Sequence, residues 1–173
     1  MSHDSTPRAH ADAARTLYDD DILLWSEQQA ELIRALGRRR DLPNALDTEN
    51  VAEEIESVGR SELAAVKSLI RRIFFHLMIL AVEPEAAAAR CWRVEIAGFH
   101  ADMRRRYAPS MRQRIDLDAL WRSALEQLAL THEGTPLAEA VATLPRTAAI
   151  GLDDLLAAPF DSAAAAGRIR AQA

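Results

Sequence analysis

Residues 73–82 read IFFHLMILAV, and this stretch decides the fold because it is apolar on almost every side of a helix. A helix without a polar face is normally buried at the centre of a domain. The stretch is also too short for a transmembrane helix, which needs about 20 apolar residues. We therefore predict that residues 73–82 form the buried centre of a helical bundle.

The apolar pattern continues on the N-terminal side of this stretch. It reaches back to Ser61, a residue type that caps helix N-termini, so a helix is predicted over residues 61–82. Gly59 is expected to end a separate helix, which begins after Asp47 or Thr48, because glycine commonly follows the last turn of a helix.

Apolar residues at three- and four-residue spacing predict further helices in the rest of the chain. Their expected bounds are about 19–36, 85–107, 115–128 and 136–143, followed by one or two turns at 151–156. The apolar face of the first of them consists of Tyr18, Ile22, Trp25, Leu32 and Leu36. No run of residues shows the alternation of a strand. The predicted fold class is all-α, a single-domain helical bundle of five to seven helices.

The helical domain is expected to cover residues 17–160. Residues 1–16 are polar and unpatterned, and residues 161–173 have little to bury. Segments that bury nothing stay disordered at chain ends. We therefore predict a disordered N-terminal segment and a flexible C-terminal tail.

The composition restricts the class of protein. The 173 residues include 21 basic and 26 acidic side chains, for a net charge of −5. This acidic balance disfavours nucleic acid as a partner, although arginines cluster at 38–40 and 104–106. Cys91 is the only cysteine, so the chain has no internal disulfide. With no membrane-spanning stretch and no signal peptide, the protein is expected to be cytoplasmic, without membrane contact.

Several motifs are similar to those of a bacterial family. The motif positions are Tyr18, Asp21, Trp25, Glu53, Glu54, Glu56, Gly59, Arg60, His76 and Trp92. On these motifs the chain resembles the family called domain of unknown function 29, from about residue 17 to residue 160. The resemblance implies an all-helical fold, and it implies no particular activity.

Three carboxylates are predicted to share one face of the helix that precedes Gly59. At about 100° per residue, Glu49, Glu53 and Glu56 lie within roughly 60° of one another. Such a face suits a hard divalent cation, Mg²⁺ or Mn²⁺. One interpretation is therefore a metal-dependent phosphohydrolase acting on a nucleotide-like substrate, with arginines 104–106 holding phosphate. No second acidic pair has the required spacing, so no catalytic residue is assigned.

The same acidic face also suits salt bridges. Residues 47–62 include six acids and one base, whereas residues 101–115 include five bases and one acid. The two segments are complementary, within one chain or across a homo-oligomer. We favour this interpretation: a non-enzymatic helical interaction module, without a cofactor, that self-associates or binds a protein partner.

The remaining chemically interesting side chains have structural interpretations. His76 lies beside an apolar helix face and has no nucleophile near it in sequence, so a hydrogen-bonded core histidine is expected. Trp25, Trp92 and Trp121 occur at helical spacing with other apolar residues. They are expected in a core or an interface rather than at a cofactor.

Overall fold

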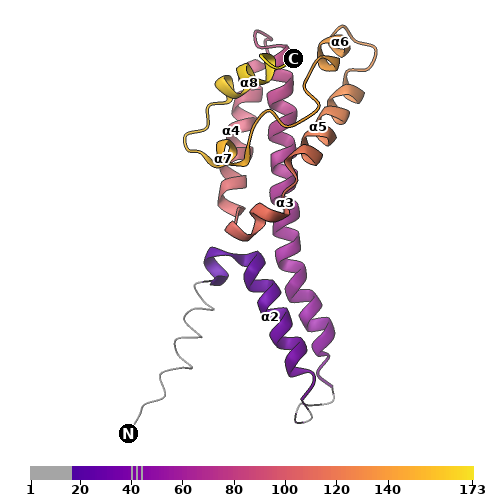
Figure 1. Cartoon of the computed structure of the whole chain (residues 1–173), viewed down its shortest axis with the longest axis vertical. Helices are drawn as coiled ribbons and strands as arrows, with labels where there is room; N and C mark the ends of the chain where they lie inside the picture. The colour runs from indigo at the N-terminus through magenta and orange to yellow at the C-terminus, as the bar shows by residue number, and fades with distance from the viewer. Residues whose placement is uncertain (1–16, 40, 42, 44) are drawn as a thin grey trace. The chain divides into compact units, whose positions relative to one another are not determined.

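The computed structural model describes residues 17–39, 41, 43 and 45–173, and these residues form helices and turns without any strand. The predicted all-α class is therefore confirmed (Figure 1). None of the described helices is long and apolar enough to cross a membrane. The predicted disorder of residues 1–16 lies outside the described residues.

The chain divides into two compact units where the sequence predicts a single domain. Among the described residues, unit 1 contains 17–64 and 107–114, and unit 2 contains 65–106 and 115–173. The division falls inside α3 (Thr48–Val82), a helix of 35 residues. At 1.5 Å per residue such a helix is about 50 Å long, so no single small core covers all of it.

Unit 1 is a helical hairpin with a short addition. α2 (Ile22–Leu36) lies antiparallel to the first part of α3, and the 3₁₀ helix η1 (Pro109–Arg114) completes the unit (Figure 1). Asp21 joins these pieces. Its carboxylate caps α2 by accepting from the Leu24 amide at 3.0 Å, and it accepts from the amide and the hydroxyl of Ser110 at 2.9 and 2.6 Å.

The helix end predicted at Gly59 is wrong, because α3 continues through it. Gly59 lies where α3 meets α2. A Cβ atom there would overlap the Oγ atom of Ser26 and lie 3.0 Å from the Cα atom of Leu23. The glycine therefore allows two helices to approach closely. Ser61 lies inside the helix and caps nothing.

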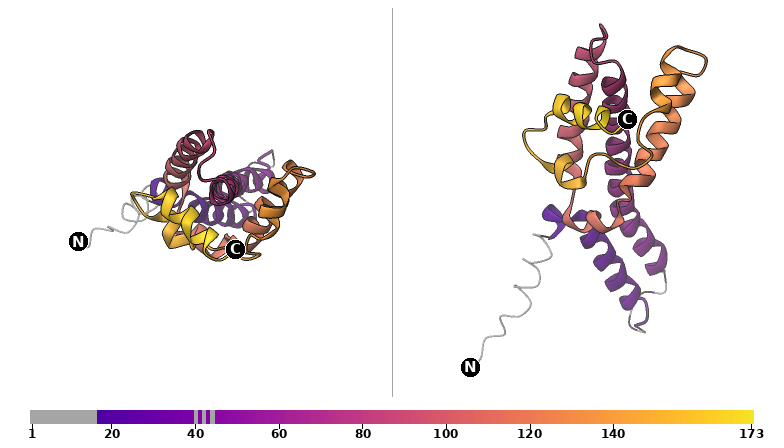
Figure 2. Two further views of the ribbon diagram at one scale, coloured as in Figure 1. Left: turned by 90° about the horizontal axis from the view of Figure 1, so that it is seen from above. Right: turned by 45° about the horizontal axis from the view of Figure 1, so that its top comes forward.

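Unit 2 is built around the second part of α3. The helices α4 (Ala89–Arg106), α5 (Leu117–Thr131) and α8 (Ser162–Arg170) lie around it (Figure 2). The short helices α6 (Leu137–Ala142) and α7 (Leu152–Leu156) complete the unit. Most of the central stretch is buried as predicted: Ile73, Phe74 and residues 77–81 are inaccessible or nearly so, whereas Phe75, His76 and Val82 are half-buried. The ring of Phe74 meets that of Trp121 edge-on, with centroids 5.1 Å apart.

The segment 161–173, which the sequence predicts to be a flexible tail, contains the helix α8. Asp161 caps α8, accepting from the amides of residues 163 and 164. Two alanines and Ile169 of this helix are buried, and Arg170 Nε donates to the Ala81 carbonyl at 3.0 Å. Small side chains thus bury enough surface to hold the segment in place.

Candidate functional site

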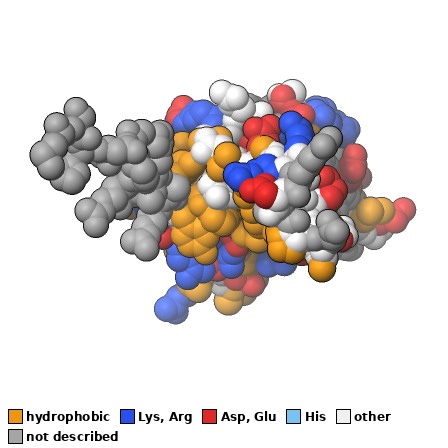
Figure 3. Space-filling model, turned by 90° about the horizontal axis from the view of Figure 1, so that it is seen from below, with side chains coloured by type: hydrophobic (Ala, Val, Ile, Leu, Met, Phe, Trp, Pro, Cys, Tyr) orange, Lys and Arg blue, Asp and Glu red, His pale blue; other side chains and the backbone are white. Residues whose placement is uncertain are grey.

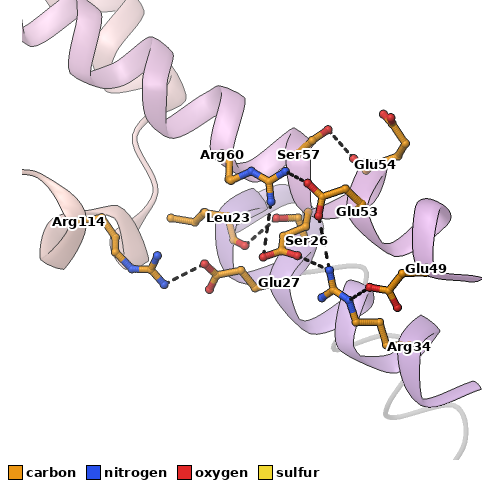
Figure 4. Close-up of polar contacts among 11 residues, drawn as sticks. Leu23, Ser26, Glu27, Arg34, Glu49, Glu53, Glu54, Ser57, Arg60 and Arg114 are labelled. Carbon is orange, nitrogen blue, oxygen red and sulfur yellow. Dashed lines mark hydrogen bonds and ion pairs between the residues drawn. The ribbon is translucent and has the colours of Figure 1, made fainter. Parts of the chain in front are cut away.

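The acidic face predicted from the sequence exists on α3. Glu49, Glu53 and Arg60 lie on one side of the helix (Figure 4). Glu56 lies on the same side, since it contacts both Arg34 and Arg60. Their exposure decreases towards the interior, from 76% for the Glu49 side chain to 29% for that of Glu56. The face therefore belongs partly to the α2–α3 contact.

Arg34 of α2 is the central partner of this face, and sequence reasoning missed it. Its Nη2 atom lies 2.7 Å from Oε2 of Glu56 and 3.7 Å from Oε2 of Glu53, and its Nε atom lies 3.2 Å from Oε1 of Glu49. Figure 4 shows the guanidinium reaching from α2 to the carboxylates of α3. One arginine thus contacts all three carboxylates.

Arg60 completes the network from within α3. It donates to Glu53 and lies 3.6 Å from Glu56. The hydrogen bond from Arg34 lowers the pKa of the Glu56 carboxyl, and the bonds to Glu56 and Glu49 raise the pKa of Arg34. The Glu56 carboxylate is therefore held in its charged form by Arg34.

This pairing changes what the acidic face can do chemically. Among the described residues, no group of three acidic, histidine or cysteine side chains has the geometry of a metal site. A Mg²⁺ or Mn²⁺ ion at Glu53 and Glu56 would have to displace two guanidinium groups. The metal interpretation of Glu49, Glu53 and Glu56 stays a prediction.

Two arginines of the basic segment 101–115 pair with acids of their own unit. In unit 1, Arg114 donates to Glu27 of α2 at 2.9 Å. In unit 2, Arg105 pairs with Asp102, three residues earlier, also at 2.9 Å. Glu27 lies at a hollow of about 340 Å³ that Arg34 and Glu56 also line. Arg34 and Arg60 contact Glu49, Glu53 and Glu56 of α3.

The opposite side of the hairpin is apolar and exposed. Leu32 lies about 200° around α2 from Arg34, and Val51 lies about 200° around α3 from Glu53. Leu32 is 58% exposed, and the other large exposed hydrophobic residues of unit 1 are Tyr18, Leu36, Leu46, Val51 and Val58. Figure 3 shows the molecule from below, the end at which α2 connects to α3. Hydrophobic side chains, drawn in orange, form one group on this surface.

A mainly apolar stripe runs along α2 on this side. Its four apolar members, which we call the α2 stripe, are Ile22, Trp25, Leu32 and Leu36, and the polar Gln29 lies between Trp25 and Leu32. The sequence predicts these large side chains as the packed face of the helix. The structure buries Leu23, Ser26 and Ala30 instead, the face that meets α3 at Gly59.

The remaining family-motif positions are mostly structural. Tyr18 packs edge-on against Trp25, with ring centroids 4.7 Å apart. Glu54 is exposed, and its carbonyl accepts from the Ser57 hydroxyl. In unit 2, Trp92 is half-buried on α4. His76 is half-buried and hydrogen-bonded at both ring nitrogens.

The fold and this surface define a class: an all-helical protein with a hairpin that is ion-paired on one side and apolar and exposed on the other. The sequence model of the family described as "Domain of unknown function DUF29" matches residues 17–161. The chain therefore belongs to this family, and the resemblance seen in the sequence is confirmed.

One solved structure extends the comparison. The chain is similar to an α-helical protein of unknown function from Rhodospirillum rubrum, known from a crystal structure. The two are 37% identical, with 88% of this chain and 96% of that one covered and a TM-score of 0.79. No curated protein matches the chain.

Proposed function

We propose that the protein is a non-enzymatic interaction module that self-associates through the apolar side of its hairpin. The observation that carries the proposal is the α2 stripe, whose Leu32 and Leu36 are exposed, as are Val51 and Val58 of α3. Exposed apolar surface gathered in this way marks interaction sites.

The spacing of the stripe favours a second copy of the chain as the partner. With Gln29 at its centre, the stripe advances in alternating steps of three and four residues, which is the seam along which two helices pair. A single polar residue within such a seam is tolerated, and it fixes the register of the two helices. A two-fold dimer brings the same patch of both copies together, so one stripe suffices for both sides.

The residues that flank the stripe are compatible with this pairing. The exposed or half-buried positions beside it on α2 are Gln28, Ile33 and Ala35, which carry no charge. Charged side chains at such flanking positions select the partner and the orientation of paired helices. Two copies of this helix therefore approach without charge repulsion along the stripe.

The ion-paired side is less suited to this role. Glu49, Glu53 and Glu56 already accept from Arg34 and Arg60, and breaking these contacts would offset what a partner's arginines contribute. We therefore place the self-association on the apolar side. Association through apolar surface persists at high salt, whereas association through charges weakens there.

Sedimentation velocity of the full chain at micromolar concentration tests the proposal. We expect a dimer at low and at high salt, and a monomer for Leu32→Glu. Leu130→Glu is the matched control, because Leu130 is an exposed leucine on a helix of unit 2, and it should stay dimeric. Circular dichroism checks that both variants fold. A monomeric wild type, or a dimeric Leu32→Glu, would contradict the proposal, and a dimer lost only at high salt would move the interface to the charged side.

A further inference from the structure

A pocket in unit 2 gathers cationic and aromatic side chains from three helices. Arg71, Arg72, Phe75 and His76 of α3, Phe99 of α4 and Gln127 of α5 line a cavity of about 290 Å³. Ligand pockets for small molecules begin at about 300 Å³. The cavity is therefore sized for a small metabolite rather than for a peptide.

Neither arginine of the pocket is neutralised by an acid. In the part of the chain that the structure describes, no carboxylate lies within ion-pair distance of Arg71 or Arg72. Arg71 donates to the amide oxygen of Gln127, and the guanidinium of Arg72 lies 5.5 Å from the ring centroid of Phe99. An amide and an aromatic ring orient a guanidinium without cancelling its charge.

His76 of the pocket contacts Glu95 of α4. Oε2 of Glu95 lies 2.9 Å from Nε2 of His76, while Nδ1 lies 2.8 Å from the Arg72 carbonyl. Both ring nitrogens thus lie within hydrogen-bond distance of an oxygen atom. Glu95 therefore contacts the histidine and not the two arginines, whose charges remain for a ligand.

Aromatic rings supply the rest of the wall. The ring of His76 lies 5.3 Å from that of Phe75 and 5.5 Å from that of Phe99, centroid to centroid. Arginine holds a carboxylate through two parallel hydrogen bonds, and aromatic walls suit a flat apolar body. A pocket with both features favours a molecule that is anionic at one end and apolar at the other.

We propose that this pocket binds a small aromatic carboxylate, whose carboxylate group is held by Arg71 and Arg72 and whose ring lies against Phe75 and Phe99. The site lies wholly within unit 2, so it does not depend on the self-association proposed for the hairpin. The ligand class follows from the charge and the walls together: the arginines require the anion, and the phenylalanines require the ring.

NMR titration of the full chain with benzoate tests this proposal. We expect saturable chemical-shift changes of the amides at residues 71–76 and 95–99. Acetate and inorganic phosphate, which lack the ring, should bind at least tenfold more weakly than benzoate. Benzyl alcohol, which lacks the charge, should also bind at least tenfold more weakly. If phosphate bound as tightly as benzoate, the proposed contribution of the aromatic rings to binding would be contradicted. If benzyl alcohol bound as tightly as benzoate, the proposed contribution of the arginines would be contradicted. A wild type without saturable shifts would overturn the proposal as a whole.

Variants separate the two halves of the site. Arg72→Gln should weaken benzoate at least tenfold, whereas Arg93→Gln, which removes an exposed arginine of α4, should leave it unchanged. Phe99→Leu should weaken benzoate while leaving the weak binding of acetate as it is. Should Arg72→Gln fail to fold, Phe99→Leu and the benzyl alcohol titration decide the question. Equal effects of the Arg72 and Arg93 substitutions would contradict the assignment.

Discussion

Replacing Gly59 with alanine tests the close contact between α2 and α3. The added Cβ would overlap the Oγ atom of Ser26 and lie 3.1 Å from Cδ1 of Leu23. Ser26 has little freedom to move, because it is fully buried and its hydroxyl donates to the Leu23 carbonyl at 2.9 Å. The clash is therefore relieved mainly by separating the two helices.

Two opposing effects determine the size of the change. Overpacking a well-filled contact costs about 1–3 kcal/mol. Alanine in a helix interior is favoured over glycine by about 1 kcal/mol. We expect the overlap with a buried atom to lie at the upper end of the first range, so Gly59→Ala should lose about 1–2 kcal/mol of unfolding free energy. For a chain of this size that lowers the melting temperature by about 2–8 °C.

Chemical denaturation followed by circular dichroism measures this change, and the chain contains its own control. Gly98 is also helical, but a Cβ there would have no neighbour within 4 Å, so Gly98→Ala should stabilise by about 0.5–1 kcal/mol. Ser26→Ala should restore part of the stability of Gly59→Ala, because it removes the atom that clashes. If Gly59→Ala were stabilising like Gly98→Ala, or if Ser26→Ala gave no recovery, the close contact would be refuted.

Three further predictions concern charged groups. Below neutral pH, Arg34→Leu should make the free energy of unfolding less dependent on salt concentration, because the substitution removes the cation that contacts three carboxylates. Urea titrations at low and at high salt measure this dependence. Thermal shift with Mn²⁺ should show no stabilisation of the wild type, whereas the phosphohydrolase interpretation requires about 2.7 kcal/mol at a hundred times the dissociation constant. Burial lowers the pKa of His100, so the unfolded chain takes up its proton first on acidification. The unfolding free energy should therefore fall as the pH drops below about 6.5, and His100→Gln should flatten this fall.

The buried centre was predictable because its pattern is local. Ile73, Phe74 and Leu77 belong to a run with no polar face, and such a run is buried whatever packs against it. The end of the preceding helix was not predictable in the same way. A glycine within a helical pattern either ends the helix or admits a neighbour, and the neighbour of Gly59, Ser26, lies far away in the sequence.

The acidic face illustrates the same limit. Helical spacing alone placed Glu49, Glu53 and Glu56 together, but it did not reveal Arg34, whose role depends on the hairpin. Had the connection after α2 been recognised as a hairpin turn, Arg34 in the last turn of α2 would have been expected opposite the first turns of α3.

The choice of the face that α2 buries also bears on its function. α2 meets α3 through small side chains, Ser26 and Ala30, against Gly59, while the larger Leu32 and Leu36 remain exposed. Burying the larger side chains would remove more apolar surface from water, at about 25 cal/mol per Å². A hairpin selected only for its own stability would therefore bury the α2 stripe against α3. The observed arrangement instead combines a tight contact between small residues with an exposed apolar surface, and the self-association proposed above would remove that surface from water.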